Sequence, residues 1–120
     1  MYENDKKHGH GIFEWESGNR YMGNYQEDER HGYGEMKWMD ESTYMGMWDQ
    51  GIQHGVGVMV FPDGVQRAGV FEENVFVESL KHRSQLDPYK DLLKEECLKL
   101  LEDILRQKEH SKAELFGPLQ

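Results

Sequence analysis

Hydrophobic and polar positions alternate with a period of two over most of the first 77 residues. In the segment Tyr21-Met22-Gly23-Asn24-Tyr25, both tyrosines and the glycine share one face of an extended strand. From Gly32 to Trp38, glycine, methionine and tryptophan again share one face, with tyrosine, glutamate and lysine on the other. This alternation predicts β-strands whose structural face is built from glycine and aromatic side chains.

The strand pattern repeats at a fixed interval of 23 residues. The segment His8-Gly9-His10-Gly11 returns as His31-Gly32-Tyr33-Gly34 and again as His54-Gly55-Val56-Gly57. The segment Tyr21–Tyr25 returns at Tyr44–Trp48, and a weaker copy follows in which arginine takes the place of the first tyrosine. A repeat of this length is one supersecondary unit that buries its apolar face by stacking on its neighbours. Residues 1–77 are therefore expected to form one stacked array of β-hairpins.

Polar segments separate the expected strands. Gln26–Arg30 and Asp49–Gln53 are predicted to be hairpin loops within a unit. Ser17–Asn19 and Pro62–Gly64 are predicted to be turns between units. Glycine weakens strands, so its recurrence inside them indicates a different purpose. We expect close backbone approach, or strong twist, beneath a large aromatic ring.

The chain changes character after residue 77. Residues 78–86 are predicted to be a linker, residues 87–110 an amphipathic helix and residues 111–120 a flexible tail. Asp87 suits the N-cap position and Pro88 the first helical position. The apolar positions expected to form the helix interface are Tyr89, Leu93, Leu100, Leu101, Ile104 and Leu105.

The expected helix carries more apolar surface than one partner would cover, because its apolar positions span over half of the helical circumference. One interpretation is that the helix caps the open end of the array and hides Val58, Val60 and Phe71. The other is that one flank also binds a second chain, either as a homodimer or as a partner helix. The sequence leaves both interpretations open.

Composition restricts the classes of function. The chain has 120 residues, with 14 Lys and Arg against 23 Asp and Glu, and a net charge of −9. Nucleic-acid binding is not expected without a basic footprint, and the same charge disfavours binding to anionic membrane lipid. One cysteine prevents an intramolecular disulfide, and no segment has the roughly 20 apolar residues that span a bilayer. The first eight residues lack a signal-peptide core, so we expect a soluble, cytoplasmic protein.

Candidate chemistry is sparse. His8, His31 and His54 recur at the repeat period, which explains them as loop-to-strand residues without a metal ion. The His-Gly-x-Gly pattern comes with neither a Gly-x-Ser-x-Gly nucleophile elbow nor the third glycine of a dinucleotide fingerprint. No catalytic residue, metal site or cofactor is therefore expected. Cys97 lies within the apolar stripe of the helix and is expected to be a small core residue.

The combination of Tyr-x-Gly-x-aromatic, a polar loop and His-Gly-x-Gly, repeated every 23 residues, resembles the MORN repeat over roughly residues 2–74. The resemblance implies a mainly β fold, a single-layer antiparallel β-hairpin solenoid with an aromatic-lined groove, here followed by the C-terminal amphipathic α-helix. The chain enters the repeat array midway, so it is expected to be a fragment or isoform of a longer array. Carried onto this sequence, the groove positions are Tyr21, Tyr25, Trp38, Tyr44, Trp48, Trp15 and Phe61, with Tyr2 at one flank.

The resemblance also implies a function. MORN-repeat proteins act as scaffolds or adaptors, so the leading hypothesis is a non-enzymatic protein that binds a protein partner in the aromatic groove. Acidic rims would suit a helix or extended peptide with apolar anchors and basic flanks. One alternative is a peripheral module that binds membrane phospholipid, and another is a targeting appendage of a larger protein. Family habit places such a chain in a ciliary, flagellar or cytoskeletal assembly.

Overall fold

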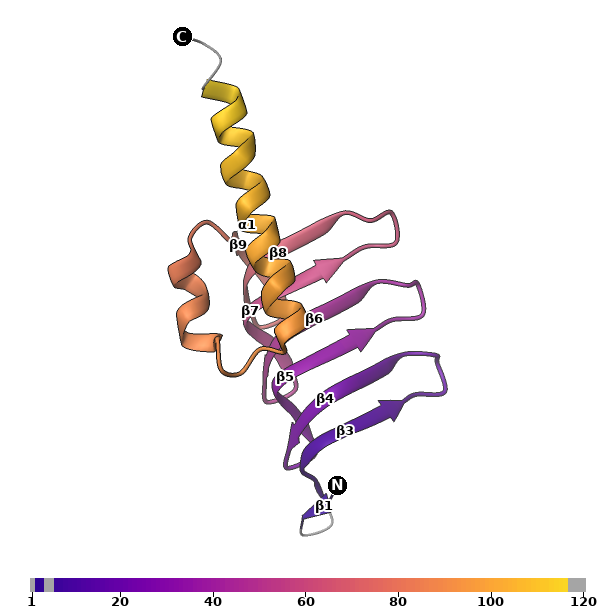
Figure 1. Cartoon of the computed structure of the whole chain (residues 1–120). Helices are drawn as coiled ribbons and strands as arrows, with labels where there is room; N and C mark the ends of the chain where they lie inside the picture. The colour runs from indigo at the N-terminus through magenta and orange to yellow at the C-terminus, as the bar shows by residue number, and fades with distance from the viewer. Residues whose placement is uncertain (1, 4–5, 117–120) are drawn as a thin grey trace.

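The structure is a computed structural model that describes residues 2–3 and 6–116. Within these residues, β3 to β9 form one antiparallel sheet in which every strand pairs with the next along the chain (Figure 1). The short strands β1 and β2 pair separately with each other. The mainly β fold with a C-terminal helix is confirmed. The strands are β1 (Tyr2–Glu3), β2 (Lys6–Lys7), β3 (Gly9–Glu14), β4 (Arg20–Gln26), β5 (Glu29–Lys37), β6 (Thr43–Asp49), β7 (Ile52–Val60), β8 (Gln66–Glu72) and β9 (Val75–Ser79).

A row of glycines crosses the seven-stranded sheet from β3 to β8. Strand register pairs each glycine with one on the next strand, because both halves of every repeat carry glycine at the matching position. Within a hairpin the two backbones approach closely: a Cβ added to Gly23 would lie 2.4 Å from the Gly34 Cα. Because glycine has no side chain, neighbouring strands can approach and bend at these positions. The row consists of Gly11, Gly23, Gly34, Gly46, Gly57 and Gly69.

Each full repeat places a tyrosine ring over this row. A Cβ on Gly34 would lie 2.0 Å from the Tyr21 hydroxyl oxygen, and one on Gly57 would lie 2.4 Å from that of Tyr44. The Tyr44 hydroxyl donates to the Met47 carbonyl at 2.9 Å, and the Tyr21 hydroxyl donates in the same way one repeat earlier. The expectation that glycine allows close approach beneath an aromatic ring is confirmed.

The hairpin turns within the repeats are tighter than the sequence predicted. Strand β4 continues to Gln26 and β5 starts at Glu29, so only Glu27 and Asp28 form the turn. Both have positive φ, 48° and 68°, which is the geometry of a two-residue hairpin turn that matches the strand twist. The corresponding turns one and two repeats later also have positive φ at both positions. The predicted five-residue loops are therefore mostly strand.

The C-terminal helix starts later than predicted. Asp87 and Pro88 lie inside a short 3-10 helix, η1 (Arg83–Tyr89), and the α-helix α1 runs from Glu95 to Phe116. The break has a tertiary cause: it allows Leu86 of η1 to be buried on the sheet before the chain turns back and α1 crosses it. Burial of these side chains outweighs the local helix-start signal, so the predicted start at residue 87 was wrong.

The predicted linker and tail also need correction. Residues 78–86 contain the end of β9 and the start of η1, and so they do not form a plain linker. Helix α1 continues through residues 111–116, which were predicted to belong to a flexible tail. Residues 117–120 of that predicted tail lie outside the described residues.

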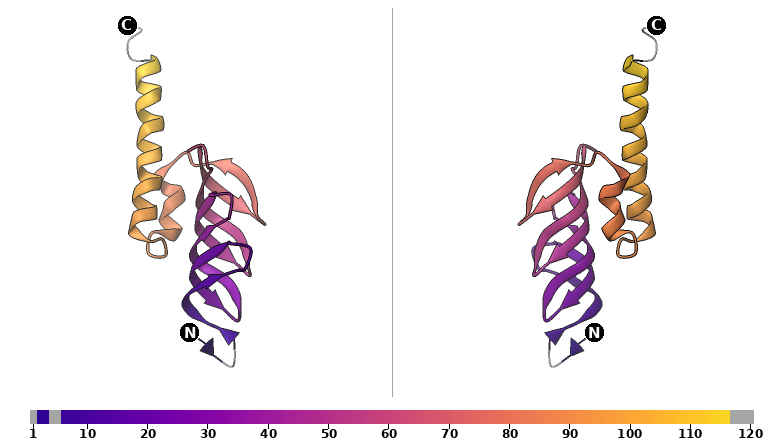
Figure 2. Two further views of the ribbon diagram at one scale, coloured as in Figure 1. Left: turned by 90° about the vertical axis from the view of Figure 1, so that its right-hand side faces the viewer. Right: turned by 90° about the vertical axis from the view of Figure 1, so that its left-hand side faces the viewer.

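The helix covers one face of the sheet, whereas the capping interpretation of the sequence placed it at the open end of the array. Figure 2 shows η1 and α1 together on one side of the strands, with no described element over the other side. Val58 is fully buried under the helix and Val60 packs at the same cluster, as expected. Phe71 belongs to the core on the opposite face, so its predicted contact with the helix was wrong. Alternation along each strand sends neighbouring residues to opposite faces, and this separates Phe71 from the valines.

Candidate protein-interaction groove

The sheet face opposite α1 is built from an aromatic row that runs through the repeats. Trp48 lies between two tyrosines, with ring centroids 5.6 Å from Tyr21 and 5.2 Å from Tyr44, and both contacts are edge-to-face. The row continues from Tyr44 to Phe71 at 5.0 Å. The Trp48 indole nitrogen also donates to the Gly34 carbonyl at 3.2 Å. This geometry is favourable for aromatic pairs and makes the row a continuous core.

Four of the predicted groove residues are core residues of that row. Tyr21 and Tyr44 have no exposed surface, and Tyr25 and Trp48 are also buried. Burial raises the pKa of the Tyr21 and Tyr44 phenols above the ordinary value, so both hydroxyls stay protonated at neutral pH. Tyr21 and Tyr44 therefore support the face without presenting surface to a partner.

The rest of the predicted set lies at the rim of the face. Trp15 and Trp38 are partly buried and line a hollow of about 540 Å³ together with Trp48, Met36 and Met59. A second hollow adjoins the first and shares Trp15 with it. We call the two hollows together the tryptophan groove. A volume of this order is typical of ligand sites in proteins.

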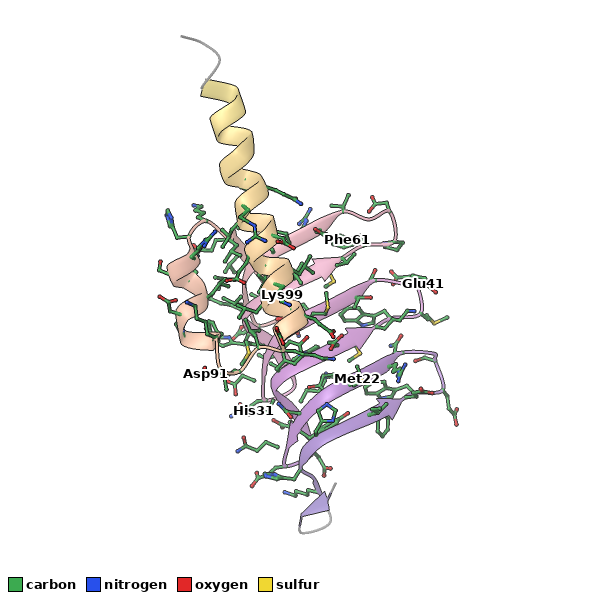
Figure 3. The ribbon with its side chains drawn as sticks, viewed as in Figure 1. Met22, His31, Glu41, Phe61, Asp91 and Lys99 are labelled. Carbon is green, nitrogen blue, oxygen red and sulfur yellow. The ribbon has the colours of Figure 1, made fainter. Side chains whose placement is uncertain are left out.

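Phe61 and Tyr2 do not belong to the described groove. Phe61 occupies the third-repeat position that corresponds to Trp15 and Trp38, but it lines neither hollow. It lies in a loop at the margin of the sheet (Figure 3), where the Arg67 guanidinium stacks 5.8 Å from its ring centroid. The Tyr2 side chain lies outside the described residues.

The structure adds one groove residue that the sequence did not indicate. Arg30 lines both hollows, and its guanidinium carbon lies 4.8 Å from the Trp48 ring centroid and 6.0 Å from that of Trp15. Its Nη2 donates to the Gly51 carbonyl at 2.8 Å. Sequence reasoning assigned Arg30 to a polar hairpin loop. No residue pattern at Glu27 and Asp28 indicated the shorter turn that places Arg30 in β5.

The predicted helix interface is used within the chain. Leu93, Leu101 and Leu105 are buried against the sheet, and Tyr89, Leu100 and Ile104 pack around them. Polar contacts reinforce the docking: Lys94 Nζ lies 3.8 Å from a Glu35 carboxylate oxygen, and Lys108 Nζ donates to the Leu80 carbonyl at 3.0 Å. All six predicted interface positions thus belong to the cluster that joins η1, α1 and the segment between them to the chain's own sheet.

Cys97 is the free cysteine of the chain, and it is buried where α1 packs on the sheet. Burial raises the pKa of the Cys97 thiol to about 12, with the nearby Glu35 carboxylate adding to the effect. A neutral, enclosed thiol is a poor nucleophile. Among residues 2–3 and 6–116, no three His, Cys, Asp or Glu side chains group closely enough to hold a metal ion. Within the same residues, every helix is too short or too polar to cross a lipid bilayer.

Comparison with known families agrees with this geometry. The model of the MORN repeat matches three consecutive segments, residues 1–20, 21–43 and 44–66, which together make up more than half of the chain. The antiparallel hairpin array defines a β-solenoid repeat protein, and the chain belongs to the MORN-repeat family. MORN repeats are non-catalytic modules that generally mediate interactions with proteins or membranes. No significant match to a curated protein was found.

Proposed function

We propose that this chain is a non-enzymatic adaptor that holds a helix or an extended segment of a partner protein in the tryptophan groove. The observation that supports the proposal most is the difference between the two faces of the sheet. One face is covered by the chain's own helix, whereas the other presents the partly buried Trp15 and Trp38 rings around an open hollow. Tryptophan is enriched among the residues that dominate protein interfaces.

The charge of the chain favours a protein partner over a lipid surface. A net charge of −9 opposes approach to anionic phospholipid, and MORN repeats serve either kind of interaction in general. We also propose, from the habit of the family alone, that the partner belongs to a ciliary, flagellar or cytoskeletal assembly. Whether the chain acts alone or as an appendage of a larger protein does not alter the role proposed for the groove.

The test is selection of random peptides displayed on phage against the intact chain, followed by affinity measurements on synthetic copies of the enriched peptides. The groove variant is Trp38→Ala, because Trp38 lines the hollow without being part of the fully buried row. The matched control is Ile12→Ala, which removes an apolar side chain that is 57% exposed on the opposite face of β3. Circular dichroism establishes that both variants keep the fold.

We expect peptides that bind the intact chain and the Ile12 variant equally, with a loss of at least about tenfold in affinity for the Trp38 variant. Peptides that bind all three proteins alike would show that the groove is only a core. Co-sedimentation with vesicles containing phosphatidylserine is the parallel arm. Binding of the intact chain to these vesicles at physiological salt, lost in Trp38→Ala, would replace the protein partner with a lipid surface.

A further inference from the structure

The charge that lines the larger hollow of the tryptophan groove is opposite in sign to the net charge of the molecule. The chain carries −9, yet Arg30 is the only charged residue among the described residues that line the larger hollow. The rest of that lining is aromatic, methionine or neutral polar. An anchor that fills this hollow therefore meets one positive group surrounded by apolar and neutral polar side chains.

The Arg30 guanidinium is incompletely satisfied by the chain itself. Its Nη2 donates to the Gly51 carbonyl, while its enclosed Nε has no acceptor among the described residues. None of the ion pairs within the described residues involves Arg30. A guanidinium offers five N–H donors, and a buried donor without an acceptor costs free energy. The enclosed Nε lies out of reach of a ligand, but the two Nη groups carry more donors than the single bond to Gly51 uses. These donors favour a ligand that brings an acceptor, above all a carboxylate, which can bond two donors at once.

The tryptophan rings hold this cation in place. Arg30 lies over Trp48 and close to Trp15 and Tyr21, so its stacking contacts come from rings that are themselves fixed in the core or at the groove wall. A stacked guanidinium gives up little conformational freedom when it binds a carboxylate. Since Arg30 and Trp15 line both hollows, a ligand that spans the groove must pass over them.

The second hollow limits how acidic such a ligand can be. Asp28 and Glu29 line it beside Arg30. A run of acidic residues would be repelled there and by the net charge of the chain, whereas a basic residue next to the carboxylate would be favoured. The next two repeats place Gln53 and Phe76 at the position of Arg30, so among the side chains that the structure describes the tryptophan-stacked cation occurs at one repeat. One such cation would fix the register of an extended ligand.

We propose that Arg30 binds a single aspartate or glutamate side chain of the partner segment. In that segment, an apolar residue on one side of the carboxylate fills the larger hollow, and a basic residue on the other side lies near Asp28 and Glu29 in the second hollow. This inference rests on the proposed function, because it names the chemistry of the segment that the groove would hold. It replaces a ligand defined only by apolar anchors and basic flanks with one that has a carboxylate at its centre.

The experiment extends the peptide selection to a double-mutant cycle. Peptides enriched on the intact chain are synthesised in pairs that differ only by Glu or Gln, or Asp or Asn, at the shared acidic position. Each pair is titrated against the intact chain, Arg30→Gln and Arg30→Lys. We expect the acidic peptide to bind the intact chain at least about tenfold more tightly than its amide, and the preference to disappear in Arg30→Gln. Arg30→Lys keeps the charge without the planar fork and should retain only part of the preference.

Two outcomes separate this inference from the proposed function. Enriched peptides that depend on Trp38 but share no acidic position, or that keep their acid preference in Arg30→Gln, overturn the role of Arg30 and leave the groove standing. Absence of any Trp38-dependent peptide overturns the proposed function and this inference with it. If Arg30→Gln loses its fold, the acid and amide peptides are compared on the intact chain at low and high salt. An acid preference that salt weakens supports the ion pair, and equal binding refutes it.

Discussion

The Tyr44 ring and Gly57 show how a single residue type controls this fold. The ring lies so close to the strand beneath it that any side chain at residue 57 would collide with the hydroxyl group. Tyr44 cannot move aside easily, because it has no exposed surface and its hydroxyl is bonded to the Met47 carbonyl. Glycine therefore stabilises the array at this position even though glycine weakens strands in general.

Alanine substitution along the glycine row should show this position dependence. A Cβ on Gly57 would lie 2.4 Å from the Tyr44 hydroxyl oxygen, whereas one on Gly11 would lie 3.7 Å from the nearest Tyr25 ring atom, an ordinary contact. Gly57→Ala should lower the free energy of unfolding by about 3 kcal/mol, and Gly11→Ala should change it by less than about 0.5 kcal/mol. Urea unfolding followed by circular dichroism measures both. Equal effects of the two substitutions would contradict the close-approach explanation.

The buried Cys97 thiol should make the protein less stable as the pH rises above about 9. Burial raises the pKa of its thiol from 9.0 to about 12. Below pH 9 the thiol is neutral in both states, so its contribution to stability is complete. As the pH rises from 9 toward 12, the unfolded chain loses the proton while the folded chain keeps it, so the contribution is progressively lost.

The resulting prediction compares the intact chain with Cys97→Ala at pH 7 and pH 10. Between these values the free energy of unfolding of the intact chain should fall by roughly 1 kcal/mol more than that of the variant. Buried tyrosines titrate in both proteins and cancel in the difference. Urea unfolding at the two pH values provides the measurement, and parallel losses in the two proteins would show that the thiol is accessible to hydroxide when folded.

At the scale of elements, the turns between repeats show where the second copy of a motif differs from the first and the third. Gly18 and Gly64 occupy equivalent turn positions with φ of 101° and 89°, and the second repeat places Glu41 there with φ of 77°. Left-handed backbone is readily adopted by glycine and costs other residues free energy. The Glu41 side chain is largely exposed, and its ion pair with Lys37 at 3.6 Å contributes little at the surface.

Glu41→Gly should therefore stabilise the chain. The free energy released by removing the left-handed strain exceeds the entropic cost of a more flexible unfolded chain. We therefore expect the free energy of unfolding to rise by about 0.5 kcal/mol. The reverse change at the equivalent position, Gly64→Glu, should lower the free energy of unfolding by about 1 kcal/mol. Thermal and urea unfolding measure both variants. A loss of stability in Glu41→Gly would show that the Lys37 contact outweighs the backbone term.

At the scale of the whole molecule, one sheet separates two cores of different composition. Aromatic side chains and Met36 fill one face, whereas valine, leucine and Cys97 join the helix to the other. The molecule is elongated, 65 × 30 × 23 Å, because the hairpins stack in one direction and α1 projects beyond the last strand (Figure 1). A sheet with two apolar faces needs a second layer on at least one of them, and α1 provides it.

Truncation of helix side chains should reveal how much stability this layer contributes. Leu101 is fully buried against the sheet, and Leu92 is 55% exposed in the turn before α1. Leu101→Ala should lower the free energy of unfolding by about 3 kcal/mol, and Leu92→Ala should change it by less than about 0.5 kcal/mol. Hydrogen exchange should show the loss of protection in β6 to β8, beneath the helix. A large effect of Leu92→Ala would instead indicate that the exposed flank contacts a second chain.

The sequence by itself determined the repeat, the strands and the composition of each face, because strand periodicity and a 23-residue interval are local properties. It also located glycine beneath the rings. Only the tertiary structure decided that glycines from neighbouring strands form one row. The row depends on strand register, and the register depends on two-residue turns with positive φ. No residue pattern at Glu27 and Asp28 predicted such a turn. The tertiary structure also decided the place of Arg30. The sequence predicted it in a loop, and the shorter turn places it in β5, where it lines the groove. The helix start moved from Asp87 to Glu95 because burial of Leu86 on a distant strand outweighs the capping preference of one residue.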